Sequence, residues 1–358
     1  MNIVILAGGG GTRLWPVSRK KNPKQAQPFI GTKTLLQVTY ARQRKGFPIK
    51  DIFISSNVTQ YPLIKKQLPS VPRRNYILET AKRDTAPAIG LAAVSIHKRN
   101  PHGIMMSVGS DHFIKDERAY IRLAKLAEQI IKKNPEYSLL IGVRPTYPEI
   151  GYGYVKINKL FSQVGQTEIF YGERFVEKPD LVTAKKYAHS WDYLWNTNMF
   201  CWRVDTLLAM YQRYLPEHYR RLMIIQRAIG TSREQAVIKK EFAQMRAVSI
   251  DYAIMEKTKK MLVLPATFDW TDVGHWRTVH EVLAQHPHDN IIRGQHIGID
   301  SKSNLIFSYT GRLIGTAGLE RMIVIDMEDA LLICSQDRAH DVKKIVAEIE
   351  KKKLDKYL

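Results

Sequence analysis

Residues 2–16 read Asn-Ile-Val-Ile-Leu-Ala-Gly-Gly-Gly-Gly-Thr-Arg-Leu-Trp-Pro, an apolar run that leads directly into four consecutive glycines. The apolar run is typical of a buried strand. Residues without Cβ atoms let the backbone approach an anion closely and present several N–H groups to it. Thr12 adds a hydroxyl donor, and Arg13 and Lys24 add positive charge behind the loop. The stretch therefore predicts a strand followed by a loop that binds phosphate groups.

Two common phosphate-binding motifs do not match this loop. A P-loop requires Gly-Lys-Ser/Thr after four spacer residues, whereas Gly-Thr-Arg stands at residues 11–13. A dinucleotide-binding loop opens a helix at its third glycine and has an acid about 20 residues later. Here Pro16 opposes an immediate helix, and no acid occurs before Asp51. A plain flexible turn is the remaining alternative, but such a turn would not require the two basic residues.

Short apolar runs alternate with helix-length periodic segments over the first 150 residues. Such alternation predicts parallel strands joined by crossover helices, with helices on both faces of the sheet. In a Rossmann-like α/β sheet of this kind, ligands bind outside the carboxyl ends of the strands. We expect strands at residues 3–7, 51–55, 76–78, 104–108 and 138–143, and helices at 35–44, 59–68, 87–98 and 119–132.

In the middle of the chain strands and helices alternate less regularly, and in the last part short β-type segments predominate. In the middle we expect strands at 151–158, 168–176 and 261–265, and helices at 181–189, 204–214, 219–229, 234–245 and 252–258. After about residue 286, short β-type segments separated by Gly, Asp and Ser predict a small β-rich domain. We therefore expect two domains, 1–286 and 287–358, the second with strands at 290–298, 304–309, 312–316, 322–325 and 330–334 and a final helix at 339–353.

The charge of the chain raises the question of an anionic partner. The formal net charge is +21, from 55 Lys and Arg against 34 Asp and Glu, which suggests an anionic polymer or membrane. However, the lysine pairs are scattered, no basic helix has base-reading spacing, and no aromatic-interleaved motif occurs. No apolar run reaches ~18 residues, the length of a membrane-spanning helix. We expect neither a nucleic-acid nor a membrane partner, and a nucleic-acid-binding protein stays as an alternative.

The N-terminus and the cysteines bear on location. No basic segment precedes the first apolar run, so we interpret that run as a strand and not as a signal peptide. Two cysteines, Cys201 and Cys334, are too few for a disulfide framework. We expect both to be core thiols of a cytoplasmic protein.

The glycine loop resembles the signature of the sugar-1-phosphate nucleotidylyltransferases, Gly-Gly-x-Gly-(Thr)-Arg-Leu-x-Pro followed by Pro-Lys. The form Gly-Thr-Arg-Leu-Trp-Pro-x-Ser-Arg with Pro-Lys-Gln is similar to the mannose-1-phosphate guanylyltransferase branch, although Gly10 stands where Ser is usual. The resemblance implies that Arg13 and Lys24 stabilise the diphosphate leaving group and the α-phosphate. It also implies that the loop wraps the nucleoside triphosphate through Leu6, Ala7, Gly8, Gly9, Gly11 and Thr12.

Two acidic motifs follow predicted strands. Asp111 comes just after the strand at 104–108, where a carboxylate suits Mg²⁺, although a single Asp is more often a cap or a turn residue. The segments Ser-Asp-His at 110–112 and Asp-Val-Gly-x-Trp at 272–276 resemble the two acidic motifs of the family. The resemblance implies that Asp111 and Asp272 hold Mg²⁺. His112 is then a structural neighbour, and Asp269 is the local alternative to Asp272.

Three further segments resemble the part of the family that binds the sugar phosphate. By its residues alone, Phe-Val-Glu-Lys-Pro at 175–179 could be a strand end with a salt bridge. The resemblance implies instead that Glu177 accepts from sugar hydroxyls and that Lys178 pairs with the sugar phosphate. It also implies that the Gly153 backbone and the Asn196 side chain lie near the sugar. Two positions depart from the pattern: Asn198 replaces a glycine, and Ile150 replaces a threonine.

The choice of base depends on residues 83–88, Arg-Asp-Thr-Ala-Pro-Ala, which resemble the segment beside the base in the guanylyl branch. Asp84, next to Thr85, replaces the usual Asn. A carboxylate there could accept from guanine N1–H and N2–H₂, a pair of donors that adenine lacks. Residues 249–257 resemble another segment of the branch, which we interpret as a helix capped by Ser249 or Asp251, with Tyr252 and Met255 packed inward.

The resemblance implies a glycosyltransferase-A-like α/β nucleotidyltransferase domain and a small β-helix-like C-terminal domain, through which a homodimer forms. It implies the reaction of GTP with α-D-mannose 1-phosphate to give GDP-mannose and diphosphate, assisted by Mg²⁺ and by Arg13, Lys24, Asp111 and Asp272. We expect no fused phosphomannose isomerase domain. Two other functions stay open: the same transfer to manno-heptose or glucose 1-phosphate, and an inactive regulatory or binding homologue.

Overall fold

The computed structural model describes all residues, 1–358, and the chain divides into two compact units. Unit 1 consists of Met1–Gly8, Tyr40–Gly109 and Ile114–Trp270, and unit 2 of Gly9–Thr39, Ser110–Phe113 and Thr271–Leu358. The units do not follow chain order, because the glycine loop and the Asp111 turn belong to the same unit as the C-terminal part. The domain boundary predicted at residues 286–287 concerns positions along the chain, and this spatial division does not test it.

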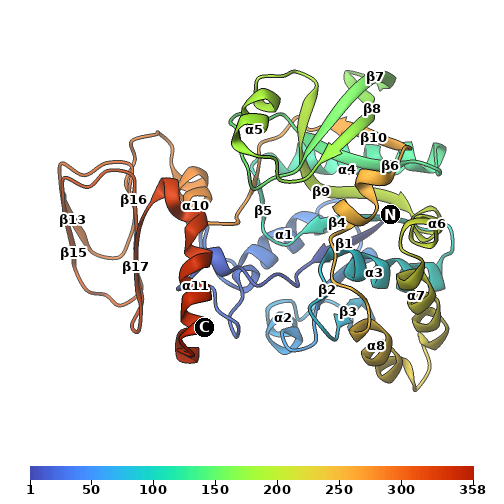
Figure 1. Ribbon diagram of the computed structural model, residues 1–358, viewed down its shortest axis with the longest axis horizontal. Coiled ribbons are helices and arrows are strands. Elements are labelled where there is room, and N and C mark those ends of the chain that lie inside the picture. The colour runs from blue at the N-terminus through green and yellow to red at the C-terminus, as the bar shows by residue number, and fades with distance from the viewer. The chain divides into compact units, whose positions relative to one another are not determined.

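Unit 1 is built on one nine-stranded sheet. The strands β1, β2, β3 and β4 pair in parallel, as do β6 and β10, whereas β9 runs antiparallel between β4 and β6. The pair β7–β8 forms a long antiparallel hairpin at the end of the sheet (Figure 1). In spatial order the strands are β3 (Tyr76–Glu79), β2 (Ile52–Asn57), β1 (Asn2–Leu6), β4 (Ile104–Gly109), β9 (Tyr193–Arg203), β6 (Ser138–Val143), β10 (Met261–Pro265), β8 (Thr167–Val176) and β7 (Tyr154–Val164).

Helices such as α3 and α4 pack on this sheet because each turns an apolar stripe toward it, and α7 packs on α3 and α6. In α4 the side chains of Leu123, Ala127 and Ile131 recur at helical spacing and are buried, and Asp116 caps the helix by accepting from Ala119 N at 2.9 Å. The helices are α1 (Leu35–Arg44), α2 (Tyr61–Gln67), α3 (Thr85–Arg99), α4 (Glu117–Lys133), α5 (Leu181–Ala188), α6 (Val204–Tyr214), α7 (Pro216–Ala228), α8 (Glu234–Ala243) and α9 (Ile250–Ala253).

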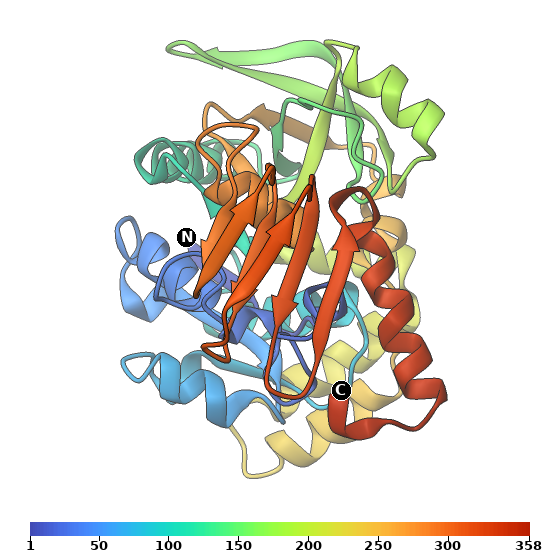
Figure 2. The same ribbon diagram turned by 90° about the vertical axis from the view of Figure 1, so that its left-hand side faces the viewer.

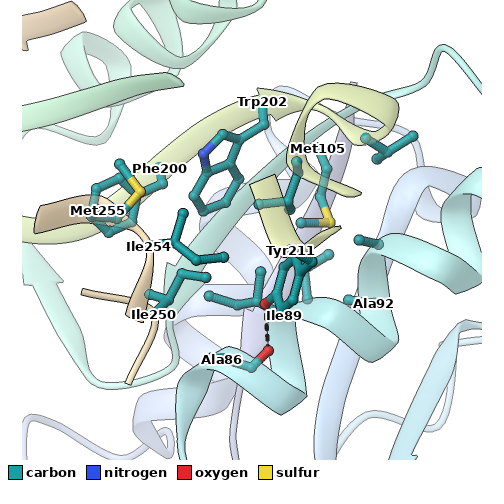
Figure 3. Packing of buried hydrophobic residues seen from close by; sticks show 14 of the residues in the cluster. Ala86, Ile89, Ala92, Met105, Phe200, Trp202, Tyr211, Ile250, Ile254 and Met255 are labelled. Carbon is teal, nitrogen blue, oxygen red and sulfur yellow. Dashed lines mark hydrogen bonds between the residues drawn. The ribbon is translucent and has the colours of Figure 1, made fainter. Parts of the chain in front are cut away.

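A buried cluster joins α3 to β9, α6 and α9 (Figure 3). Phe200 and Trp202 stack with ring centroids 5.3 Å apart, and Trp202 is fully buried. The Tyr211 hydroxyl donates to the carbonyl of Ala86, at the first turn of α3. This packing fixes the amino end of α3, where the predicted base-binding segment lies.

Two short strands link the predicted acidic motifs. β5 (His112–Ile114) pairs with β11 (Trp270–Asp272) in a separate two-stranded ribbon. Just beyond it, Val273 N donates to the Asp111 carbonyl at 3.0 Å. The ribbon therefore holds Asp111 and Asp272 next to each other, although 160 residues separate them in the chain.

Unit 2 contains a small β-helix-like region (Figure 1). Its strands pair in parallel, β12 with β14, β14 with β16, and β13 with β15, and only β17 is antiparallel to β16. Figure 2 shows the orange and red strands side by side, with the red helix α11 beside them. The elements are α10 (Trp276–Leu283), β12 (Ile291–Arg293), β13 (His296–Ile299), β14 (Leu305–Ser308), β15 (Ile314–Ala317), β16 (Met322–Asp326), β17 (Leu331–Ser335) and α11 (Val342–Lys351).

A fully buried asparagine stabilises one corner of this region. Asn304 Nδ2 donates to Asn290 Oδ1 at 3.1 Å and to the Leu319 carbonyl at 2.8 Å. Its Oδ1 accepts from Met322 N at 2.8 Å. The side chain therefore joins three successive turns of the chain.

The predicted α/β fold with a large parallel-rich sheet and a β-rich C-terminal region is confirmed, with differences in detail. The segment 290–298 is two strands, because Gly294, with a φ of 103°, turns the chain between them. The segment 252–258 is the short helix α9 followed by a 3₁₀ turn. The last helix begins at Val342, after a 3₁₀ helix, η6 (Gln336–Asp341). No helix combines the length and apolar character needed to cross a membrane.

Candidate functional site

The glycine loop closes against Lys24 and Ser18. Gly11 has a φ of 62°, and a Cβ there would lie 2.6 Å from both Lys24 Cβ and Ser18 Oγ. A larger residue does not fit this turn, so glycine is required. The Ser18 hydroxyl donates to the Gly10 carbonyl at 3.3 Å. The chain then enters a 3₁₀ helix, η1 (Thr12–Leu14), which carries Thr12 and Arg13.

At the start of the loop, β1 delivers Leu6, Ala7 and Gly8 to the carboxyl edge of the unit 1 sheet. Ala7 N still donates to the Ser55 carbonyl of β2, at 2.7 Å. A Cβ on Gly8 would lie 3.3 Å from Oε1 of Glu79, which ends β3. The chain therefore reaches the first glycine just after β1, as the apolar run at residues 3–7 predicts.

Lys24 is the centre of a charged cluster in unit 2. Its Nζ forms an ion pair with Asp111 Oδ2 and lies 3.8 Å from Asp272 Oδ1. The side chains of Lys24, Asp111 and Asp272 are 11%, 16% and 26% exposed. The structure therefore brings together three of the four predicted catalytic residues in a mostly buried site.

The pKa values of the pair follow from opposing effects. Burial alone lowers the pKa of Lys24, but the carboxylates of Asp111 and Asp272 outweigh it and hold that pKa above its ordinary value. Burial likewise disfavours the charged form of Asp111, yet Lys24 and then His112 lower its pKa below the usual range. Lys24 and Asp111 are therefore both charged at neutral pH.

Arg13, the fourth residue, lies beside the cluster. A Cβ on Gly274 would be 3.1 Å from Arg13 Nη2 and 3.3 Å from Asp272 Oδ2, so both side chains flank Gly274. Arg13 Nη1 lies 3.4 Å from Nδ1 of His340, a residue of η6. The arrangement places two cations and two carboxylates within reach of one small ligand.

The two carboxylates fit a magnesium site. Mg²⁺ prefers carboxylate and phosphate oxygens. Asp272 Oδ1 is buried and has no hydrogen-bond partner, as expected of an oxygen that a cation would use. Asp269, the predicted local alternative, is exposed, and its carbonyl accepts from Lys115 N at 3.4 Å. The structure therefore favours Asp272 over Asp269 as the partner of Asp111.

A second cluster, in unit 1, contains the predicted sugar-binding residues. A Cβ on Gly153 would clash with Glu177 Oε2 and would lie 3.4 Å from Asn196 Nδ2. The Glu177 side chain is 7% exposed, and its Oε2 is buried without a hydrogen-bond partner. Lys178 Nζ forms an ion pair with Glu177 Oε1. Gly153, Glu177, Lys178 and Asn196 are thus neighbours, with one buried carboxylate oxygen still available.

The Asn196 carboxamide already has partners on both ends. Its Nδ2 donates to Asp251 Oδ1 at 2.9 Å and its Oδ1 accepts from Asn198 N at 2.9 Å. Asn198 has a φ of 57°, so the backbone there keeps the conformation that a glycine would adopt. The replacement of glycine by Asn198 therefore leaves the local backbone suited to the motif.

Asp84 and Thr85 lie at the amino end of α3. Asp84 is the N-cap, with Oδ1 accepting from Thr85 N at 2.7 Å, and its φ of 68° is unusual for a residue with a side chain. Thr85 Oγ1 accepts from Ile250 N at 2.9 Å. Both side chains therefore have structural hydrogen bonds, and Asp84 itself is exposed.

Sequence reasoning missed Glu79 and Asp251. Burial raises the pKa of Glu79 to about 7, although the Ser55 hydroxyl, donating at 3.0 Å, opposes this. Its position directly after the predicted strand at 76–78 was the signal, the same signal that marks Asp111. Burial and then the charge of Glu177 raise the pKa of Asp251 to about 7. Asp251 offered no such signal, because its sequence context is that of a helix cap.

The helix at 249–257 is partly as predicted. Ser249 caps it, accepting from Tyr252 N at 3.3 Å, and Met255 is buried. The prediction that Tyr252 packs inward is wrong, because this side chain is 46% exposed. Asp251 takes the inward position instead and joins the Glu177 cluster.

Comparison with known proteins identifies relatives along almost the whole chain. The family model described as "Nucleotidyl transferase" matches residues 2–288, and one described as "MannoseP isomerase/GMP-like beta-helix domain" matches residues 294–349. The xanthan biosynthesis protein XanB of Xanthomonas campestris is 34% identical over 97% of this chain and 73% of its own. A mannose-1-phosphate guanylyltransferase of Escherichia coli K12 is 32% identical over the same shares.

A solved structure agrees with this result. The crystal structure of a protein from Thermus thermophilus, described as a mannose-1-phosphate geranyltransferase, superposes with a TM-score of 0.86 and 28% identity. The match covers 98% of this chain and 99% of that one.

Proposed function

Because the chain belongs to the nucleotidyl transferase family, as a homologue of mannose-1-phosphate guanylyltransferases, we propose that it transfers the guanylyl group of GTP to α-D-mannose 1-phosphate. The products are GDP-mannose and diphosphate. The observation that carries the proposal is the buried cluster of Lys24, Asp111 and Asp272, with Arg13 beside it. Two cations and two carboxylates suit a reaction in which a highly charged leaving group departs.

The transfer is a single displacement. An oxygen of the sugar phosphate attacks the α-phosphorus of GTP in line, a new P–O bond forms, and the bond to the diphosphate breaks. No covalent enzyme intermediate is needed, so the protein contributes positioning and charge neutralisation. Arg13 and Lys24 offset the negative charge that develops on the diphosphate.

Mg²⁺ would be held by Asp111 and Asp272. When bound, it would neutralise phosphate charge and orient the phosphate oxygens. Lys24, ion-paired with Asp111 in its present position, would then be released toward the phosphates of GTP. The loop of Leu6, Ala7, Gly8, Gly9, Gly11 and Thr12 would present backbone N–H groups and the Thr12 hydroxyl to the same triphosphate.

The sugar phosphate would bind at the unit 1 cluster. Glu177 Oε2, buried and without a partner, would accept from a sugar hydroxyl, and Lys178 would leave Glu177 for the phosphate. The Gly153 backbone would approach the sugar closely. Asn196, whose carboxamide already bonds Asp251 and Asn198, would contribute through its remaining acceptor capacity.

Guanine selection is proposed for the Asp84–Thr85 segment. Asp84 Oδ1 accepts one bond from Thr85 N and keeps a further lone pair, so the two carboxylate oxygens would accept one bond each from the guanine N1–H and N2–H₂ donors. If Asp84→Ala left the preference for GTP over ATP unchanged, this role of Asp84 would be wrong.

We propose a homodimer that forms through the C-terminal β-region. Ile297, Ile299 and Leu313 are 61%, 65% and 57% exposed there, and Ile297 and Ile299 share one face of β13. Exposed apolar patches of this kind mark protein–protein contacts. Sedimentation analysis of Ile297→Asp with Ile299→Asp would test it, since a dimer would become a monomer. A cytoplasmic location stays a prediction, motivated by the cysteine usage.

The decisive test is a panel of substrates. Purified protein with Mg²⁺ is assayed for diphosphate release from GTP, ATP, CTP and UTP with mannose, glucose and manno-heptose 1-phosphates. We expect GTP with mannose 1-phosphate to give the highest kcat/KM. A higher value with another sugar 1-phosphate would favour the alternative substrate, and no turnover with any pair would favour the inactive homologue.

A further inference from the structure

The segment that follows the glycine loop is built into the C-terminal region of unit 2. Leu14, Trp15 and Val17 are buried in one apolar cluster with residues of α10, β14 and α11. The Trp15 carbonyl accepts from Trp276 Nε1 at 2.8 Å, and Trp15 Nε1 donates to the Tyr357 carbonyl at 2.8 Å. The loop flank therefore shares its core with the C-terminal region.

An ion pair continues this connection. Arg19 donates through Nη1 and Nη2 to the two carboxylate oxygens of Asp329, at 2.7 and 2.6 Å. Its Nε donates to the Pro16 carbonyl at 2.8 Å. A bidentate contact of this type fixes orientation as well as distance. The position of Arg13, between these anchored residues and the glycines, thus depends on the C-terminal region.

His340 contacts Arg13 directly. Arg13 Nη1 lies 3.4 Å from His340 Nδ1, and because a guanidinium can only donate, Nδ1 must be the acceptor. His340 belongs to η6 (Gln336–Asp341), directly before α11. Gly274 lies near the other guanidinium nitrogen: a Cβ there would be 3.1 Å from Nη2, so the missing side chain leaves the space that Nη2 occupies. The Arg13 guanidinium therefore has His340 at Nη1 and the Gly274 backbone near Nη2.

His340 is itself held in place. Its ring lies against that of His275, with centroids 4.2 Å apart. His275 is 3% exposed and caps α10, where its Nδ1 accepts from Thr278 N at 3.3 Å. Burial and then the neighbouring His340 and Arg13 lower the pKa of His275 to about 2, so this ring is neutral. The His275 ring therefore adds no positive charge beside His340.

We propose that His340 is a positioning residue which the C-terminal region supplies to the phosphate-transfer site, accepting a hydrogen bond from Arg13 and orienting its guanidinium toward the departing diphosphate. The proposal rests on the proposed function for the identity of the leaving group. It makes the C-terminal β-region a part of the active site as well as a candidate dimer surface.

The test compares His340→Leu with His340→Asn in the full-length protein. Leu removes the acceptor, whereas Asn places an amide oxygen on Cγ, where Nδ1 is attached in histidine. We expect His340→Leu to lower kcat about 10- to 100-fold, the range for a misplaced catalytic group, with the KM for the sugar 1-phosphate unchanged within about twofold. His340→Asn should restore most of kcat. His288→Leu, at an exposed histidine of the same unit, is the matched control and should match wild type.

Binding provides a readout that does not depend on turnover. Isothermal titration calorimetry with magnesium diphosphate should show about tenfold weaker binding for His340→Leu than for His340→Asn or wild type. Equal unfolding temperatures of the three proteins would exclude a general structural effect. If His340→Leu folds poorly, His340→Ala, which only removes atoms, takes its place.

Two results would overturn the proposal: equal kcat and diphosphate affinity in His340→Leu and wild type, or equal losses in His340→Leu and His340→Asn. Failure of the proposed function looks different. Wild type would then release no diphosphate with any sugar 1-phosphate, while the diphosphate affinities of the His340 variants would still decide the role of His340.

Discussion

At the scale of single residues, Asp111 carries the sharpest prediction for catalysis. Its carboxylate is ion-paired with Lys24 and faces Asp272 across the same small space. Asp111→Asn keeps the shape but removes the negative charge, so both the metal and Lys24 lose their partner. We expect kcat to fall by about two or more orders of magnitude at saturating Mg²⁺.

The control for this variant is Asp269→Asn, which changes an exposed aspartate three residues before Asp272. It should leave turnover and Mg²⁺ dependence as in wild type, both measured by diphosphate release. Near-normal turnover of Asp111→Asn would remove Asp111 from the metal role.

Asp251 carries a prediction about pH and stability. Its pKa is about 7 in the folded protein, raised by burial and by Glu177, against an ordinary value of 3.8. Lys178 and Tyr252 are the other titratable groups that face it. A raised carboxyl pKa means that the folded state binds the proton more tightly than the unfolded state. The stabilising contribution is therefore complete below about pH 4 and is lost as the pH rises toward 7.

Asp251→Asn keeps an oxygen that can accept from Asn196 but cannot ionise. We expect this variant to unfold at a higher temperature than wild type at pH 8, and the gain to shrink steadily as the pH is lowered to 4. Each tenfold change in proton affinity corresponds to about 1.4 kcal/mol. Thermal unfolding followed by circular dichroism measures it; a gain that is the same at pH 4 and pH 8 would contradict the assigned pKa.

The contrast between Asp111 and Asp251 shows what could be predicted at this scale. Local motifs contain the four predicted catalytic residues, and the structure brings all of them together: Arg13, Lys24, Asp111 and Asp272. Asp251 contacts Asn196, which lies 55 residues away in the chain. His340 contacts Arg13, which lies 327 residues away. Such contacts depend on tertiary packing, and no local pattern of residues marks them.

At the scale of elements, the strands of unit 1 that consist of a short apolar run, such as β1, β4 and β6, were predictable, and β9 was not. Residues 193–203 are buried on both faces over most of their length, so no alternation of apolar and polar residues appears. The strand also contains Asn196 and Asn198, and asparagine is rare in strands. Its antiparallel position between β4 and β6 follows from packing, which local propensity does not encode.

The β-helix-like region offers a prediction about stability. Asn304 is fully buried and bonds to Asn290, Leu319 and Met322. Asn304→Ala leaves the Met322 N–H without this partner, whereas the Leu319 carbonyl keeps the bond from Lys302 N at 3.0 Å. A buried polar group without a partner costs ~1–3 kcal/mol, so we expect a loss of about 1–3 kcal/mol and a lower unfolding temperature.

Asn158→Ala, at an exposed position of β7, is the matched control and should change the stability by less than about 0.5 kcal/mol. Because the loop flank shares its core with this region, Asn304→Ala should also make turnover more sensitive to temperature. A variant as stable as wild type would show that the Asn304 bonds contribute little.

At the scale of the whole molecule, the net charge of +21 calls for an explanation that the site does not provide. Arg13, Lys24 and Lys178 account for only three of these charges. Many of the others are exposed lysines scattered along the chain, such as the pair at 132–133 and the three at 351–353. A diffuse positive field can still attract small anions such as a triphosphate and a sugar phosphate.

This field predicts a specific dependence on salt. Raising KCl from about 0.02 to 0.3 M shortens the Debye length from roughly 20 to 6 Å, so long-range attraction is screened while contacts within the site are not. We expect kcat/KM for both substrates to fall several-fold and kcat to stay nearly constant, because only encounter is affected. Sucrose at matched osmolality is the control and should leave kcat/KM unchanged apart from viscosity. A kcat/KM that does not respond to KCl would mean that the surplus charge has no part in substrate capture.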